Sequence, residues 1–410
     1  MVGQTAGAIL ACHGCGGLFD PRRVAALRCP DAIGGDGVDH VLEPILEDRR
    51  WPEGHERNPF LRYRKLSLAA RLIDDARLVD VIQALDDAVA GVDGHGFRVT
   101  PWSWSPALGC MVKDETGNVA GSHKGRHLFG LMVYLRVLEL TAHLPSRPPL
   151  AIASCGNAAL AAGVIARAAG WPLQVFVPTD ADPVVLDRLA SLGAQVRRCP
   201  REPGLSGDPA VHALHQALAQ GALPFTVQGD ACGISVEGGR TLAWELCDQG
   251  DLPDVLYVQV GGGALASAVW QGLRDARDLG RITRLPRLVL VQTENAHPLA
   301  RAWQRLDGQD LALAAQDRAR FMWPWEQAPH SVAHGILDDE TYDWWACCEG
   351  MRATGGEVVL ADEQALVAAR DEARAAGFTA SATGTAGLAG LRAHPPPAGQ
   401  RAGVLVTGRG

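Results

Sequence analysis

The chain has 410 residues, of which 47% are hydrophobic and 20% are charged. This length allows two domains or one large domain with an insertion, and the hydrophobic content supports a substantial core. A net charge of −8 without any basic run argues against nucleic acid as a partner, and the lack of an apolar stretch of about 20 residues argues against a membrane span.

The N-terminal residues do not form the charged, apolar and small-residue pattern of a secretory signal. We therefore expect a cytoplasmic protein, in which most of the ten cysteines are reduced thiols. The following stretch, 31–60, is rich in glycine, aspartate and proline and predicts an irregular arm. A helical pattern then covers 66–85, and 98–102 reads as extended because a residue before proline avoids the helix.

A C-x-x-C pair, Cys12 and Cys15, lies near the N-terminus, and Cys29 follows as a single third cysteine. A structural zinc site needs a fourth ligand, and neither His13 nor Asp31 has the usual spacing. The pattern therefore favours a small structural knuckle without a metal, with zinc as the alternative.

The most informative stretch of the first half is GSHKGR, 121–126, which follows a predicted strand over 110–115 and precedes an apolar helical run. An imine-forming lysine must be partly desolvated or lie near another cation, so that its amine is free at neutral pH. His123, Arg126 and His127 surround Lys124 with potential cations, and they could also bind a phosphate. Most lysines at helix starts are instead solvated surface residues, so Lys124 needs a second observation.

From residue 150 onwards, short buried strands alternate with helices, which predicts a parallel sheet flanked by helices. The predicted strands are 150–154, 173–177, 195–199 and 223–228, and the predicted helices are 158–169, one that starts at 182–183, and 210–219. The turn after the first strand, Ser154-Cys155-Gly156-Asn157, offers N–H groups for a carboxylate, although Asn157 could equally be a helix cap. We expect Cys155 to be a small buried residue rather than a reactive thiol.

The second half is predicted to form strands over 255–260, 288–292, 358–360 and 403–407, with helices between them. The first of these strands runs into Gly261-Gly262-Gly263-Ala264-Leu265. A strand, a glycine turn and a helix start together cradle a phosphate with free N–H groups and the helix dipole. A dinucleotide site is the competing interpretation, but the G-x-G-x-x-G pattern fails at Ala266. A lysine for an imine and a cradle for one phosphate together indicate pyridoxal phosphate.

Two hydroxyl-bearing turns come later in the chain. Thr407, after the last predicted strand, could face a pyridine nitrogen and leave it unprotonated, which favours eliminations and replacements. Thr383 lies in the turn 381–385, which either contributes to the site or caps a helix. His330 and His334 have i,i+4 spacing but no evident third ligand, so we predict no metal there. The stretch 308–350, rich in tryptophan and histidine, is expected to form a lid or an oligomer contact.

Five motifs occur in a fixed order: KDE with GSHKGR, SCGN, GGGALAS, SATGTAGLAGL and VLVTGRG. In this order they resemble the fold type II pyridoxal-phosphate enzymes, and the resemblance spans 100–410. That superfamily includes threonine synthase, serine/threonine dehydratases, cysteine synthase and the tryptophan synthase β chain. The resemblance implies an α/β fold of two domains, each an open, mostly parallel sheet flanked by helices, with the cofactor in the cleft between them.

The resemblance also implies roles for individual residues. Lys124 would be the catalytic residue that binds the cofactor as a Schiff base, and Asn157 would contact its O3′. Thr407 would lie at the ring nitrogen, and His123 resembles the histidine that contacts the phosphate in the tryptophan synthase β chain. The phosphate would bind the backbone of Gly261, Gly262, Gly263, Ala264 and Leu265, and the substrate would bind Ser154, Cys155, Gly156 and Thr383.

Within the superfamily the chain is most similar to threonine synthase, because of its cysteine-bearing N-terminus, Arg62-Tyr63 and the stretch SVEGGRT, 235–241. It departs from that family at His123, where phenylalanine is usual, and at Gly125-Arg126, where Asp-Arg is usual. We predict a lyase that performs β- or γ-elimination or replacement on a small amino acid. The alternatives are a serine/threonine ammonia-lyase, another β-replacement synthase of the superfamily, or a cofactor-binding protein without catalysis.

These features divide the chain into four predicted segments. A cysteine-containing knuckle covers 1–35, and an arm with part of the large domain covers 36–110. A small βαβ domain with Lys124 and the SCGN turn covers 111–228, and a large domain with the phosphate loop covers 229–410. We expect a homodimer because relatives commonly form one.

Overall fold

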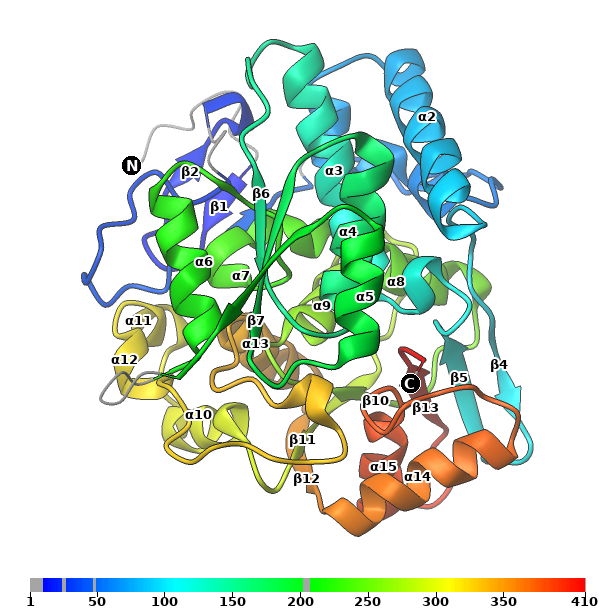
Figure 1. Cartoon of the computed structure of the whole chain (residues 1–410). Helices are drawn as coiled ribbons and strands as arrows, with labels where there is room; N and C mark the ends of the chain where they lie inside the picture. The colour runs from blue at the N-terminus through cyan, green and yellow to red at the C-terminus, as the bar shows by residue number, and fades with distance from the viewer. Residues whose placement is uncertain (1–9, 24–26, 47–48, 202–206, 410) are drawn as a thin grey trace.

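The computed structural model describes residues 10–23, 27–46, 49–201 and 207–409. Residues 1–9, 24–26, 47–48 and 202–206 and Gly410, the last residue of the VLVTGRG motif, therefore lie outside the described residues. Within the described residues, the chain forms two α/β layers, each a parallel or mostly parallel sheet flanked by helices, and a small N-terminal sheet (Figure 1). None of the helices described there has both the length and the apolar character required to cross a membrane.

The smaller α/β layer is built on a four-stranded sheet in the order β8-β7-β6-β9, and all of its pairs are parallel. Its strands are β6 (Leu150–Ala153), β7 (Leu173–Pro178), β8 (Gln195–Cys199) and β9 (Leu223–Pro224). Its helices are α4 (Asn157–Ala169), α5 (Pro183–Ser191) and α6 (Pro209–Ala219), with α6 on the opposite face from α4 and α5 (Figure 1). The expected strand 223–228 is shorter than predicted, because after Phe225 the chain turns into α7 (Gly229–Cys232).

The larger sheet has six strands in the order β12-β11-β10-β13-β5-β4, and only β4 runs antiparallel to its neighbour. Its strands are β4 (Trp102–Ser105), β5 (Cys110–Asp114), β10 (Val255–Gln259), β11 (Arg287–Thr293), β12 (Glu357–Ala361) and β13 (Ala402–Val406). One face is covered by α8 (Val236–Gln249), α9 (Ala264–Asp278) and α13 (Trp344–Thr354), and the other by α14 (Glu363–Ala375) and α15 (Ala386–Ala393). Burial on both faces explains why β10 is an unbroken apolar run up to Gln259.

Strand β5 belongs to the larger sheet, where it pairs with β13 from the C-terminal end of the chain. The predicted segment 111–228 had placed this strand with the smaller sheet, because that sheet follows it directly in sequence. A strand pattern does not show which distant strand it pairs with, and this is why the sequence led to the wrong sheet. The division into four segments otherwise stays a prediction.

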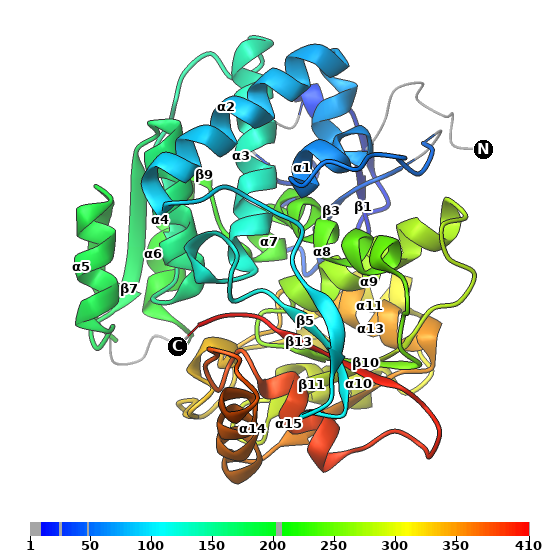
Figure 2. The same ribbon diagram turned by 90° about the vertical axis from the view of Figure 1, so that its right-hand side faces the viewer.

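Helix α2 (Asp75–Asp93) begins later than the predicted helix 66–85. The Asp74 side chain accepts a hydrogen bond from the Arg77 N–H and so caps the helix, while the residues before it form the short turns η2 (Arg64–Leu66) and η3 (Leu68–Arg71). Figure 2 shows α2 beside α3 (Lys124–Leu140) and α4, above the six-stranded sheet.

Helices α3 and α8 approach each other closely at glycines. A Cβ on Gly130 would lie 2.6 Å from the Cα of Gly238, and a Cβ on Gly239 would overlap the His127 ring. The two glycines in the stretch SVEGGRT therefore let α8 pack directly on the helix that begins with Lys124. This contact joins the N-terminal half of the chain to the six-stranded sheet.

The small N-terminal sheet has the order β2-β1-β3 and is antiparallel. Its strands are β1 (Leu10–Cys12), β2 (Leu18–Phe19) and β3 (Leu42–Pro44), so the predicted irregular arm contains one short strand. The remaining elements are η1 (Pro21–Arg23), α1 (Pro59–Arg62), η4 (Val119–Gly121), η5 (Gly233–Ser235), α10 (Pro298–Leu306), α11 (Leu311–Ala315), α12 (Arg318–Phe321) and η6 (His334–Ile336).

Candidate active site

The chain contains only three lysines, and their surroundings differ sharply. Lys65 is exposed, whereas Lys113 is fully buried with its Nζ 2.6 Å from Glu245 Oε2. Lys124 is the first residue of α3 and is partly accessible. Lys113 has no room for a ligand, and Lys65 has no enclosing site, so Lys124 is the side-chain amine suited to bind an aldehyde.

The electrostatic surroundings of Lys124 favour its neutral form. Burial lowers the pKa of its amine, while the carboxyl groups of Asp338 and Asp343 act in the opposite direction. Burial also raises the pKa of Asp338 to about 6 and that of Asp343 to about 8. These two carboxyl groups are therefore partly or largely protonated near neutral pH, which weakens their hold on the ammonium form of Lys124.

Backbone hydrogen bonds fasten the Lys124 stretch to the turn after β13. The His123 N–H donates to the Thr407 carbonyl at 3.0 Å, and the Arg409 N–H donates to the Gly121 carbonyl at 3.0 Å. Ser122 and Gly408 form an isolated antiparallel bridge between the two turns. The start of α3 and the end of β13 are thus held together although they come from distant parts of the chain.

His123 is buried beside Lys124 and keeps one ring nitrogen available. Its Nδ1 lies 3.1 Å from the Thr407 carbonyl oxygen, which can only accept, so Nδ1 carries a proton. Its Nε2 is buried and has no hydrogen-bond partner among the described residues. Burial, reinforced by the charge of Lys124, lowers the pKa of His123 to about 3. An anion that bound at Nε2 would favour the protonated ring.

Arg126 and His127 do not surround Lys124 as the sequence suggested. Arg126 is fully buried and binds Glu115 and Glu245 with N–O distances of 2.7 Å each. His127 Nδ1 lies 3.2 Å from the Ser235 carbonyl. These hydrogen bonds turn both side chains toward β5 and α8, and a sequence pattern alone does not show such distant partners. Both are therefore committed to packing rather than to a phosphate.

The SCGN turn, which follows β6 of the smaller sheet, also lies against the turn after β13. A Cβ on Gly408 would lie 2.6 Å from Asn157 Nδ2, so the Asn157 amide lies directly against the turn after β13. Gly156 is the N-cap of α4, so Asn157 is not the cap that the alternative interpretation required. The Ser154 hydroxyl accepts from the Gly156 N–H at 3.4 Å. Cys155 is exposed, which corrects the expectation of a buried packing residue.

The triple-glycine turn runs from β10 into the start of α9 as predicted. Gly263 has φ +97°, a conformation that favours glycine, and it precedes Ala264 and Leu265 in the first turn of the helix. A Cβ on Gly261 would overlap the Asp338 carboxylate, and one on Gly262 would lie 2.9 Å from the Tyr342 ring. Side chains of the stretch 336–343 therefore pack against this turn, and the Gly262 backbone lowers the pKa of Asp338 through a hydrogen bond.

Thr407 and Thr383 are joined by a residue that the motifs did not indicate. Gln259, the last residue of β10, donates from Nε2 to Thr407 Oγ1 at 2.8 Å and to the Thr383 carbonyl at 3.3 Å. The Thr383 hydroxyl accepts from the Gly335 N–H at 3.0 Å. Gln259 thus fixes the Thr407 hydroxyl, and Thr383 ties the turn 381–385 to the segment before Asp338.

Sequence reasoning missed three residues at this site: Gln259, Asp338 and Asp343. Gln259 carried a local signal, since a polar residue interrupts an otherwise apolar run two positions before the first glycine of the turn. Asp338 and Asp343 carried none, because they lie in a stretch whose contacts with Gly261 and Gly229 depend on the tertiary fold.

Comparison with known proteins places the chain in an enzyme family. The family described as "Pyridoxal-phosphate dependent enzyme" matches residues 95–408. The chain therefore belongs to the pyridoxal-phosphate-dependent enzymes, and its fold is that of fold type II. Pyridoxal phosphate is the cofactor of this family.

Among curated relatives, threonine synthases are similar to this chain at low identity. That of Methanosarcina acetivorans is 28% identical over 307 residues, which are 68% of this chain and 64% of that protein. That of Methanocaldococcus jannaschii is 26% identical over 285 residues, again 68% and 64%. That of Mycobacterium tuberculosis H37Rv is 25% identical over 304 residues, 73% and 76%. The chain thus spans about 64% of the length of the first two relatives.

Solved structures are similar in fold. Maize serine racemase matches with a TM-score of 0.60 and 18% identity, covering 80% of this chain and 92% of that chain. The processed form of threonine deaminase isoform 2 from Solanum lycopersicum matches with a TM-score of 0.59 and 17% identity, covering 82% and 86%. At these sequence identities the matches support the fold alone, and the type of reaction must be inferred from the residues of the site.

The described residues fit pyridoxal phosphate at the predicted place. The buried, unpartnered His123 Nε2 and the free N–H groups at the start of α9 suit a phosphate. The Thr407 hydroxyl suits a ring nitrogen, and the Asn157 amide suits a ring hydroxyl. These individual roles stay predictions.

Proposed function

We propose that this chain is a pyridoxal-phosphate-dependent lyase that carries out β- or γ-elimination or replacement on a small amino acid, in the manner of threonine synthase. The main observation behind the proposal is Lys124, which is partly accessible and whose pKa is lowered by burial. The chain belongs to a family that depends on pyridoxal phosphate, and such a lysine suits that cofactor. The names of the curated relatives support threonine synthase as the type of reaction.

In this proposal Lys124 has two tasks. Burial lowers the pKa of its amine and so favours the neutral form, in which Nζ can attack an aldehyde. The same nitrogen, once released, can accept a proton from the substrate α-carbon as general base. Bound pyridoxal phosphate supplies the electron sink for the charge that develops at that carbon. Asp338 and Asp343 can exchange protons with the pocket near neutral pH because their pKa values are raised.

The Thr407 hydroxyl is oriented as a donor. Because Gln259 Nε2 already donates to Thr407 Oγ1 at 2.8 Å, the hydroxyl hydrogen is free for another acceptor. An unprotonated pyridine nitrogen is such an acceptor, whereas a protonated one is not. We therefore assign Thr407 to a neutral ring nitrogen, which suits eliminations and replacements.

The remaining residues would bind and orient. The backbone N–H groups of the turn at Gly261, Gly262 and Gly263 and the His123 ring would hold the phosphate, while Asn157 would contact the ring hydroxyl. The N–H groups at the start of α4, around Ser154, would hold the substrate carboxylate. The exposed Cys155 leaves this turn open to solvent.

The first prediction concerns attachment of the cofactor. Replacing Lys124 with Ala should abolish the visible absorbance of protein-bound pyridoxal phosphate, because no other lysine lies in the site. Borohydride reduction of the wild type, followed by peptide mapping, should place the label on Lys124. Lys65→Ala is the matched control, since Lys65 is exposed and should leave the absorbance unchanged. An undiminished absorbance in Lys124→Ala would refute the assignment.

The reaction is tested with two substrates on the same preparation. Release of inorganic phosphate from phosphohomoserine that is lost in Lys124→Ala supports the threonine-synthase type. Production of a keto acid and ammonia from serine or threonine, without use of the phosphorylated substrate, would replace it with an ammonia-lyase. Cofactor binding without a spectral change on addition of any amino acid would contradict catalysis altogether.

A further inference from the structure

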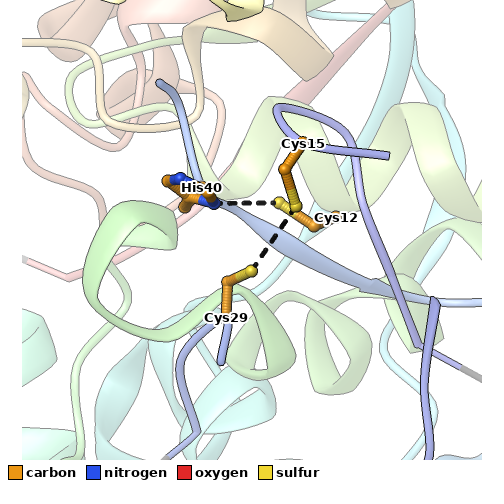
Figure 3. Close-up of side chains that lie close together, drawn as sticks. All are labelled: Cys12, Cys15, Cys29 and His40. Atoms are coloured by element: carbon orange, nitrogen blue, oxygen red, sulfur yellow. Dashed lines mark hydrogen bonds between the residues drawn. The ribbon is translucent and has the colours of Figure 1, made fainter. Parts of the chain in front are cut away.

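Four potential metal ligands converge in the N-terminal segment, away from Lys124. Cys12 ends β1, Cys15 lies in the turn after it, and Cys29 and His40 come from the loops before β3 (Figure 3). Their ligand atoms all lie within 4.8 Å of one another. Among the described residues of the chain, this is the group of histidine, cysteine and acidic side chains that has the geometry to hold a metal ion.

The distances within this group match those of a tetrahedral zinc site. Zn²⁺ binds cysteine sulfur at about 2.3 Å and histidine nitrogen at about 2.0–2.1 Å. At tetrahedral angles these bond lengths separate two sulfurs by about 3.8 Å and a sulfur from a nitrogen by about 3.6 Å. Cys15 Sγ lies 3.8 Å from Cys29 Sγ, and Cys12 Sγ lies 3.6 Å from His40 Nδ1. A disulfide would need sulfurs at about 2.05 Å.

The backbone around the first two cysteines is already shaped for a metal. The Cys12 N–H donates to the Gly17 carbonyl at 2.9 Å, and the Gly16 N–H donates to the Cys12 carbonyl at 2.9 Å. Gly16 has φ +71°, which closes the turn. The Gly17 N–H donates to Cys15 Sγ at 3.4 Å, a hydrogen bond that stabilises a thiolate more than a thiol.

His40 is oriented by a carboxylate on its other nitrogen. Its Nε2 lies 2.9 Å from Asp36 Oδ2, and Asp36 is fixed by the N–H groups of Ile33 at 3.2 Å and Val38 at 3.0 Å. A metal-bound histidine usually donates its second N–H to a carboxylate in this way, which holds the ring and its tautomer. The arrangement leaves Nδ1 of His40 directed at Cys12. Three thiols and one histidine therefore supply the four ligands of a complete site, and the Asp36 carboxylate holds the histidine ring in position.

We propose that Cys12, Cys15, Cys29 and His40 bind one Zn²⁺ in a closed structural site. Four protein ligands leave no open position for water or substrate, which separates this site from a catalytic zinc. Binding converts the three thiols to thiolates and releases their protons to solvent.

His13 and Asp31, the two candidates that the sequence analysis considered for a fourth ligand, do not belong to this group. His13 Nε2 lies 3.0 Å from Asp39 Oδ2, and its ring stacks on Trp345 at 4.3 Å. The fourth ligand is His40, which lies outside the predicted knuckle 1–35. The usual spacing of zinc ligands did not indicate it.

The metal would hold a loop that braces the proposed active site. Asp39, next to His40, donates its N–H to the Ala315 carbonyl at 2.7 Å and pairs with Arg318 at 3.2 Å. Arg318 also pairs with Glu340 at 2.6 Å, two residues after Asp338. The ion therefore supports the position of the segment that carries Asp338 without touching the reacting groups.

The test measures metal rather than activity, so it is independent of the proposed reaction. The full chain, purified without chelator and with its thiols reduced, should contain about one zinc per chain by plasma mass spectrometry. Replacing the zinc with Co²⁺ should give the thiolate charge-transfer band and the strong visible bands of a tetrahedral site. Cys15→Ser and His40→Ala should each lose most of the metal, whereas Cys199→Ser, which removes a buried cysteine outside the group, should retain it.

Asp36→Asn tests the positioning role and should weaken zinc affinity by about 10–100-fold in a competition titration with a chelating dye. The cobalt spectrum of the wild type remains decisive if a cysteine variant fails to fold. A reduced wild-type chain that takes up neither Zn²⁺ nor Co²⁺, an iron–sulfur spectrum, or zinc that is unchanged in both Cys15→Ser and His40→Ala would each overturn the proposal.

Discussion

Asp338 presents its carboxylate to the turn that is predicted to receive a phosphate. It lies against Gly261, and the Gly262 backbone and the Lys124 ammonium both lower its pKa while burial raises it to about 6. Two anions on one set of N–H groups repel each other at close range. At slightly alkaline pH, Asp338 and a phosphate therefore compete for the same turn.

We predict that Asp338→Asn binds pyridoxal phosphate more tightly than the wild type at about pH 8. The amide keeps an oxygen that can accept from Gly262 but removes the negative charge. Relief of about 1.4 kcal/mol of repulsion corresponds to about tenfold in affinity. A fluorescence or absorbance titration of the cofactor-free protein with pyridoxal phosphate measures this affinity.

Asp339→Asn is the matched control, because it removes a charge from the residue that follows Asp338 in the chain. Equal effects of the two substitutions would show that the gain is a general charge effect. Weaker binding in Asp338→Asn would instead show that Asp338 helps to hold the cofactor.

At the scale of elements, a buried network of charges joins β5, α3 and α8. Lys113, Glu115, Arg126 and Glu245 are fully buried, and Thr100 donates to Glu115 at 2.5 Å. Burial alone would raise the pKa of Glu115, but Arg126 overrides it and holds the pKa at about 2. The two cations and two carboxylates compensate one another, so removing one charge leaves the others unpaired.

We predict that Glu245→Gln lowers the free energy of unfolding by about 3–5 kcal/mol, because Lys113 and Arg126 would then share a single buried carboxylate. Chemical denaturation followed by circular dichroism measures the change. Glu372→Gln removes one partner of the solvent-exposed pair with Arg392 and should cost at most about 1 kcal/mol. Similar losses in the two variants would contradict a special role for the buried network.

Several elements were predicted correctly because their signals are local. The glycine turn, the SCGN turn and the start of α3 each combine a strand end, small residues and a helix start within a few residues. The pairing of β5 with β13 and the contact of Asp338 with Gly261 had no such signal, since both depend on residues far apart in sequence. His40 was missed for the same reason. The sequence thus predicted where these turns lie, and the fold was needed to show what packs against them.

At the scale of the whole molecule, buried carboxyl groups make stability depend on pH. Burial raises the pKa of Glu237 to about 7 and, together with Asp230, that of Asp343 to about 8. The folded chain therefore keeps protons that the unfolded chain has lost above about pH 4, so these groups reduce stability as the pH rises toward their folded pKa values. His123 and His127 act oppositely, but only below about pH 6.5, where an unfolded histidine gains a proton.

We predict that, between about pH 6 and about pH 8, the wild type loses thermal stability relative to Asp343→Asn. Asparagine keeps an oxygen for the Gly229 N–H, which donates to Asp343 Oδ2 at 3.2 Å, but it has no proton to lose. Differential scanning calorimetry across this range measures the difference. Glu349→Gln removes one partner of a partly exposed pair with Arg274, and its melting temperature should follow that of the wild type across the same pH range. A constant difference between wild type and Asp343→Asn would contradict the pKa assignment.

The scarcity of lysine has a practical consequence for labelling. When pyridoxal phosphate occupies Lys124 and Lys113 stays enclosed, Lys65 is the single side-chain amine that a succinimidyl ester can reach. A succinimidyl ester also reacts with an α-amine. Once that group is blocked, a fluorophore or a surface linker attached through this chemistry would sit at one defined point beside α1. Such a conjugate would report rotation or surface orientation of the whole enzyme without an engineered attachment site.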